Sequence, residues 1–195
     1  MTLLQRTAGD GETMQKTGLL RFFAALIILT LTLALAAIPQ PVSELVSAFC
    51  PVLLITLFVS MLLGPVYGLV IGTAAPALLS LILTGSVVFP DTVVEMTVNA
   101  VSALTAGICY RVFKTSLGAS AAALIAGRAA LAVFRILVSY FSGISYSLND
   151  FFAEGVMDVL PGLISCLVIL PLLMLAANKT GLKERLTHAP KEQYS

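Results

Sequence analysis

The chain has 195 residues, of which 58% are apolar and only 11% are charged, and its mean hydropathy is +1.01. A soluble domain is ordinarily about 45–50% apolar and about 25% charged, so this composition excludes one and indicates an integral membrane protein. The net charge is +1 and the basic residues are scattered, so the sequence shows no basic patch that would bind a nucleic acid.

Six apolar stretches follow a polar N-terminal tail, and each has about the 20 residues that a helix needs to cross a bilayer. We therefore expect an all-α integral membrane protein, a six-helix bundle, with a polar tail at 1–19, a membrane domain at 20–178 and a second polar tail at 179–195. The expected spans are 20–38, 45–63, 66–84, 92–113, 119–143 and 155–177. Breaker residues separate several of them, namely Gly64-Pro65, Pro90, Ser116 to Gly118, and Asn149-Asp150.

The distribution of lysine and arginine predicts the orientation, because cytoplasmic segments retain positive charge. With six spans, the basic residues of both tails and of the fourth connection fall on one side of the membrane. The first, third and fifth connections carry no lysine or arginine, but they carry Glu44, Asp91 and Asp150. Both termini are therefore expected in the cytoplasm. A cleaved signal peptide is an alternative for the first stretch, because Ala34-Leu35-Ala36 has the A-x-A form.

Small residues recur at four-residue spacing in two of the expected spans. Such spacing allows helix backbones to approach closely. It has two interpretations, packing inside the bundle or a surface for a membrane partner. The residues are Gly64, Gly68 and Gly72 in one span, and Ala119, Ala123 and Gly127 with Ala122, Ala126 and Ala130 in the other.

Ionisable residues inside the spans are informative, because a charge in the hydrocarbon costs at least a few kcal/mol and needs a partner or a cavity. On the expected topology, those of spans four to six converge toward the outer face. They predict a hydrophilic pocket in which an arginine clamps a carboxylate or phosphate of a ligand. The candidate substrate-binding residues are Glu95, Asn99, Arg128, Arg135 and Asp158.

Structural ion pairing is the alternative interpretation of the same residues. Arg128 and Arg135 would then neutralise Glu95 and Asp158, which would equally remove the burial penalty. Glu154 has a separate interpretation: it can be a solvated acid that is favoured in the first turn of a helix.

The sequence lacks the residues that several kinds of chemistry require. Cys50, Cys109 and Cys166 stand alone in apolar runs, without a C-x-x-C pair, and are interpreted as small apolar side chains. The one histidine, His188, lies in the C-terminal tail, so we expect no metal site and no cofactor in the membrane. The chain has no phosphate-binding loop, no G-x-S-x-G and no H-E-x-x-H motif, so we expect a non-enzyme whose nucleotide-driven steps belong to a partner.

Short motifs follow one another in a specific order along the apolar stretches. They are Cys50 to Leu54, Gly64 to Gly72, Pro76 to Leu79, Pro90, Gly107 to Arg111, Ala126 to Arg128, and Pro161 to Leu163. In this order and spacing the chain resembles the substrate-binding S components of energy-coupling factor (ECF) transporters, over about residues 20–178.

The resemblance implies a six-helix protein of the bacterial cytoplasmic membrane that captures a vitamin or similar micronutrient from outside. It implies partners as well, namely a transmembrane coupling subunit and two cytoplasmic ATPases. The loaded protein associates with them and tilts in the bilayer to release its substrate. Family members bind substrate near the outer surface with their later helices, where the candidate residues are expected. A pantothenate-type ligand suits the outer arginines.

The family often shows an A-x-x-x-A face on the first helix for docking the coupling subunit. This sequence departs from it, because Ala25 is followed four residues later by Leu29, and Ala34 by Ile38. The candidate docking residues are the small pairs Thr30/Ala34 and Thr32/Ala36.

Two other functions remain open from the sequence. A non-catalytic scaffold or assembly protein would use its small-residue faces to bind another complex, and its charged cluster would be closed by side-chain pairs. A membrane enzyme acting on lipid-linked substrates would need an acid and a base, for which Glu95 and Asp158 are the available carboxylates.

Overall fold

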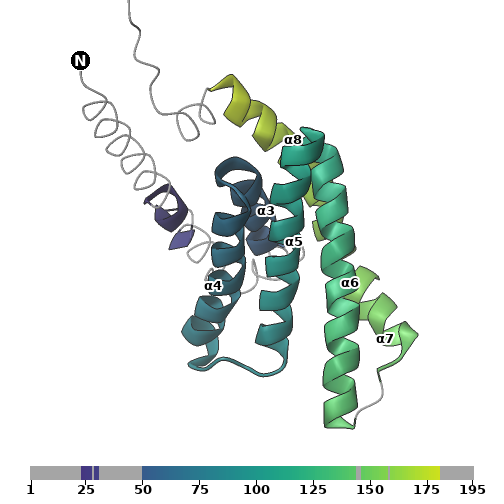
Figure 1. Cartoon of the computed structure of the whole chain (residues 1–195). Helices are drawn as coiled ribbons and strands as arrows, with labels where there is room; N and C mark the ends of the chain where they lie inside the picture. Colours follow the sequence, from purple (N-terminus) through teal and green to yellow (C-terminus); the bar gives the residue numbers. More distant parts are fainter. Residues whose placement is uncertain (1–22, 28, 31–49, 144–145, 158, 181–195) are drawn as a thin grey trace, which may run out of the picture.

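The computed structural model describes residues 23–27, 29–30, 50–143, 146–157 and 159–180, and this part of the chain is helical without a strand (Figure 1). Four segments are long and apolar enough to cross a membrane: Pro65–Thr84, Asp91–Phe113, Ser116–Ser142 and Asn149–Lys179. The prediction of a helical membrane protein is confirmed at this level.

The helices follow the expected spans closely. Residues 66–84 and 92–113 were expected, and the structure has α4 at Pro65–Thr84 and α5 at Asp91–Phe113. Before them lies α3, Pro51–Leu63, and residues 23–27 and 29–30 of the first expected span are helical too. After them come α6 (Ser116–Ser142), the short α7 (Leu148–Phe152), the π-helical turn η1 (Ala153–Met157) and α8 (Leu160–Lys179).

The predicted breaker at Gly64-Pro65 separates α3 from α4. Gly64 has a φ of 116°, which a residue with a side chain rarely adopts, and Pro65 then begins α4 with its φ already suited to a helix. In the same way, Pro90 directly precedes α5. These helix ends were predictable because the residue types themselves impose them.

Two other predicted breakers differ from the structure. Helix α6 begins at Ser116, so only Lys114 and Thr115 connect it to α5. Asn149 and Asp150 lie inside α7, where the Ser147 hydroxyl accepts a hydrogen bond from the backbone N–H of Asp150 at 3.3 Å and the Asp150 carboxylate accepts one from the Ser147 N–H at 2.8 Å. This reciprocal capping box starts a helix, so the polar pair still precedes the last expected span but lies in a short helix of its own.

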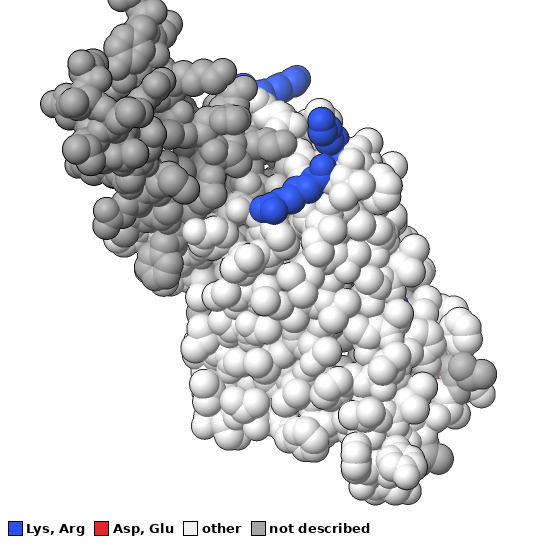
Figure 2. Space-filling model, in the orientation of Figure 1, with Lys and Arg blue, Asp and Glu red and all other residues white. Residues whose placement is uncertain are grey.

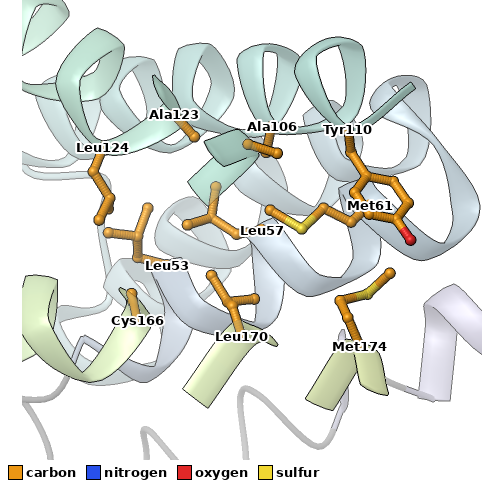
Figure 3. Packing of buried hydrophobic residues seen from close by; sticks show 11 residues of the cluster. Leu53, Leu57, Met61, Ala106, Tyr110, Ala123, Leu124, Cys166, Leu170 and Met174 are labelled. Carbon is orange, nitrogen blue, oxygen red and sulfur yellow. The ribbon is translucent and has the colours of Figure 1, made fainter. Parts of the chain in front are cut away.

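Helix α5 lies between α4 and α6, and α3 packs against α4 and α5, while α8 packs against α6 and α3. Apolar side chains of α3, α5, α6 and α8 meet in one cluster (Figure 3). Its fully buried members include Leu57 of α3 and Leu170 of α8. The same cluster contains Cys166, as expected for a cysteine that serves as a small apolar side chain.

Small residues bring α3, α4 and α5 together around one serine. The hydroxyl of the buried Ser60 donates a hydrogen bond to the carbonyl oxygen of Ala103. A methyl group added at Gly107 would lie 2.6 Å from Oγ of Ser60, and one added at Gly68 would overlap the Ser60 side chain. We call this contact of three helices the Ser60 joint.

The small residues of α6 serve the same purpose on the other side of α5. A methyl group at Gly127 would overlap the hydroxyl of Ser102, and Ala119 and Ala123 are fully buried. On α4, a methyl group at Gly72 would lie 3.0 Å from the backbone oxygen of Asn99. Packing inside the bundle is thus confirmed for these residues and for Gly68.

Candidate functional site

The register between α5 and α6 sets the depth of the candidate residues. Arg135 of α6 contacts Asp91 of α5, and Gly127 of α6 lies against Val98 and Ser102 of α5. These contacts place Arg128 level with Asn99. Glu95 lies one turn, about 6 Å, closer to the Asp91 end.

An ion pair joins the two helices at that end. Nη1 of Arg135 donates a hydrogen bond to Oδ1 of Asp91 at 3.0 Å, and the two side chains are 24% and 63% exposed. The structure pairs Arg135 with Asp91, an acid that the ion-pair interpretation of the sequence did not include. The change arises because Asp91 and Glu95 are one helical turn apart on α5, and the register brings Asp91 level with Arg135.

A double-mutant cycle measures this ion pair. We expect Asp91→Asn and Arg135→Gln to be coupled by only about 0.2–1 kcal/mol, because half-exposed pairs gain little over their interactions with water. Thermal unfolding of the two single variants and the double variant in detergent gives the coupling, which should shrink in high salt. A coupling energy well above this range that does not change with salt would contradict the description of Asp91 and Arg135 as a half-exposed ion pair.

Arg128 differs from Arg135 because it forms no ion pair with any acid of the described ranges. It lies near the middle of α6, its side chain is half-buried, and within the described residues it forms no hydrogen bond or ion pair. Among the described side chains, the thiols of Cys50, which precedes α3, and Cys166 of α8 lie within electrostatic range of Arg128. A neutral thiol does not balance a guanidinium, so Arg128 has no counter-charge in contact with it among the residues whose structure is described.

Glu95 and Asn99 lie on one face of α5, four residues apart. Glu95 is exposed, and the described part of the chain offers its carboxylate no hydrogen bond and no ion pair within contact distance. Asn99 is 9% exposed, and its amide has no hydrogen-bond partner among the same residues. Asn99 is thus level with Arg128, whereas Glu95 lies one turn away, within electrostatic range of Asp91 and Arg135.

Three residues near this site were not predicted. The thiol of Cys50 is affected by the charges of both Arg128 and Glu95. Cys166 lies within reach of Arg128 from α8, and the hydroxyl of the fully buried Thr56 has no partner in the described ranges. No local sequence signal marks these side chains, because α3, α6 and α8 come together only in the fold.

Of the remaining predicted residues, the structure describes only Thr30. Asp158 lies outside the described residues, as do Thr32, Ala34 and Ala36. Thr30 is exposed, and its hydroxyl donates hydrogen bonds within its own helix to the carbonyl oxygens of Ile27 at 2.8 Å and Leu26 at 3.2 Å.

On two adjoining helices of this helical protein, the side chains of Arg128, Glu95 and Asn99 form no hydrogen bond or ion pair with any residue that the structure describes. Over the described residues, no group of three His, Cys, Asp or Glu side chains is placed to hold a metal ion. The chain matches no protein-family profile, no curated protein and no solved structure. Assignment of a function therefore rests on Arg128, Glu95 and their surroundings.

Proposed function

We propose that this protein is the substrate-capturing membrane subunit of an ECF-type importer. It binds a small anionic micronutrient, such as a vitamin with a carboxylate or phosphate, at the outer side of the membrane. A transmembrane coupling subunit and two cytoplasmic ATPases then drive its release. The observation that carries the proposal is Arg128, half-buried in mid-helix and without an ion-pair partner in the described part of the chain.

The energy of an unpaired guanidinium supports binding of an anion. A charged side chain at the centre of a bilayer costs about 2.5–3.5 kcal/mol even on the most lenient scale, and a protein retains one where it has a use. A carboxylate or phosphate seated on Arg128 would accept two parallel hydrogen bonds and neutralise the charge. We propose an ECF-type importer in particular because the order of the sequence motifs resembles that of the S components.

The charge distribution supports a six-span topology with both termini in the cytoplasm. Arg111 and Lys114 close α5 and Lys179 ends α8, and basic side chains gather at that end of the molecule (Figure 2). Asp91 begins α5, 20 residues before Arg111 and so about 30 Å away. With the basic end inside, Glu95 lies in the outer half, where a solute from outside would enter.

A scaffold or assembly role is the second candidate. The observation that favours it is the Asp91–Arg135 ion pair, because it shows that part of the charged cluster is closed by its own side chains. Arg128 and Glu95 form no such pair with the residues that the structure describes, so we prefer capture of a ligand.

Calorimetric titration of the purified full-length protein in nanodiscs tests the proposal. The panel consists of vitamins that carry a carboxylate or phosphate, and we expect at least one to bind with a Kd below about 1 µM, or about −8 kcal/mol. Arg128→Gln should weaken the binding of that ligand by about 1.5–3 kcal/mol, because a hydrogen bond to a charged group is lost.

The matched control is Arg111→Gln, which removes an exposed arginine at the opposite end of α5 and should leave the Kd unchanged. Equal affinity of the Arg128→Gln variant and the parent protein, or no binding from the whole panel, would overturn the proposal.

A further inference from the structure

Helix α6 extends past the start of α5 at the Asp91 end of the molecule (Figure 1). Arg135 of α6 contacts Asp91, so these two residues lie at the same depth. Residues 136–142 follow in α6 and carry the helix about 10 Å beyond that depth. None of these residues is charged. The bundle thus ends in an uncharged projection, residues 136–142, which we call the α6 tip.

The α6 tip exposes apolar side chains on one side. Ile136, Leu137, Tyr140 and Phe141 are each more than half exposed, and Tyr140 is 83% exposed. The rings of Tyr140 and Phe141 contact each other edge to face, with 5.7 Å between their centroids. Contiguous apolar surface is uncommon in contact with water, and it marks a site of interaction with another protein or a membrane. The tip therefore has an interaction surface.

This surface continues a row of exposed residues farther down the same helix. Exposed residues recur every three or four positions, a spacing that brings side chains to one side of an α-helix. They are Ile125, Ala129, Val133, Ile136 and Tyr140. Helix α6 is long and apolar enough to cross a membrane, and in a membrane Ile125 and Val133 face acyl chains. The exposed side of the tip extends the same lipid-facing row.

The charged residues of α5 indicate the depth of the α6 tip. Asp91 and Arg111 are 20 residues apart, about 30 Å along the helix, which matches the thickness of the hydrocarbon core. With these residues at its two edges, the tip lies in the headgroup layer, which extends about 5–8 Å beyond the hydrocarbon on each side. Tyr140 is five residues beyond Arg135 and so lies about 7.5 Å outside that edge. Tyrosine is enriched at this level of membrane proteins.

We propose that the α6 tip is an interfacial anchor whose partner is the lipid headgroup layer on the Asp91 side of the membrane. The rings of Tyr140 and Phe141 lie against the upper ends of the acyl chains, and the tyrosine hydroxyl reaches water. Lipid is favoured over a protein partner because the exposed row runs from the tip to Ile125 without a break. The anchor holds the Asp91–Arg135 pair at the edge of the hydrocarbon, and it does not depend on the proposed function.

Fluorescence quenching tests this placement, because the chain contains no tryptophan and an introduced one reports its own position alone. Phe141→Trp and Tyr140→Trp are made in the full-length protein and placed in phosphatidylcholine nanodiscs. Both positions are more than three-quarters exposed, so the larger ring needs no room inside the bundle. The quenchers are aqueous iodide and phosphatidylcholine brominated at different acyl carbons.

The matched control is Ile125→Trp, on the same side of α6. Ile125 is 72% exposed and lies ten residues, about 15 Å, from Arg135, which places it at mid-depth. We expect both tip variants to be quenched most by lipids brominated near the glycerol end of the chain, and partly by iodide. Ile125→Trp should be quenched most by lipids brominated near the chain end, and not by iodide.

Three results would overturn the proposal. Strong quenching of the tip variants by iodide, without quenching by any brominated lipid, would place the tip in water. Quenching by neither reagent would show that protein covers the tip. A depth equal to that of Ile125→Trp would show that Asp91 and Arg135 do not mark the edge of the hydrocarbon.

Discussion

Replacing Arg128 by methionine should stabilise the ligand-free protein by about 2–3 kcal/mol, the magnitude assigned to a charged side chain at the centre of a membrane helix. The reason is that Arg128 has no hydrogen bond or ion pair to lose among the residues whose structure is described. Methionine conserves much of the length and adapts to irregular packing. Thermal unfolding in detergent, without added ligand, measures the change.

Arg135→Met is the matched control in the same helix. That substitution breaks the Asp91 ion pair, so it should bring no comparable gain and should be neutral or slightly destabilising. Loss of stability on Arg128→Met would show that the guanidinium holds the bundle together, and it would favour the scaffold role over ligand capture.

Gly127→Ala should destabilise the protein by about 1–3 kcal/mol, the usual penalty for overpacking a well-packed interior. The added methyl group would overlap the Ser102 hydroxyl, and Ser102 is only 1% exposed, so it has no room to move away. The expected consequence is a wider separation of α5 and α6. Unfolding temperature in detergent is again the measurement.

Gly118→Ala provides the comparison, because Gly118 lies in the first turn of the same helix. The new methyl group would lie 2.9 Å from Oγ1 of Thr115, which is exposed and can rotate away. Alanine is the better helix former by about 1 kcal/mol, so this variant should be neutral or stabilised. If both glycine variants behave alike, close packing at Gly127 is not what limits the contact of α5 and α6.

The sequence predicted much of the helical architecture, because the determinants of these helices are local. An apolar run of about 20 residues has few alternatives in a bilayer, and Gly64 and Pro65 end and begin helices through their own backbone geometry. The short α7 was missed for the converse reason. Its five residues are too few to show a helical period, and it depends on the capping hydrogen bonds of Ser147.

The candidate site was predictable only in part. Arg128 and Glu95 are conspicuous in any apolar stretch, whatever the fold around them. The partner of Arg135 was not predictable, because choosing between Asp91 and Glu95 requires the helix register to within one turn. Cys50 and Thr56 are uncharged, and only the packing of α3 against α5 reveals that they lie near charged or buried polar groups.

The Ser60 joint contacts α5 at Ala103 and Gly107, which lie one and two helical turns from Asn99 and two and three turns from Glu95. The contact of α3, α4 and α5 at this joint therefore depends on small residues other than Glu95, Asn99 and Arg128. Relatives of this protein could exchange the side chains at positions 95, 99 and 128 and acquire a new selectivity while the same small residues still assemble the bundle. We expect natural variation to concentrate at those three positions and to spare Ser60, Gly68 and Gly107.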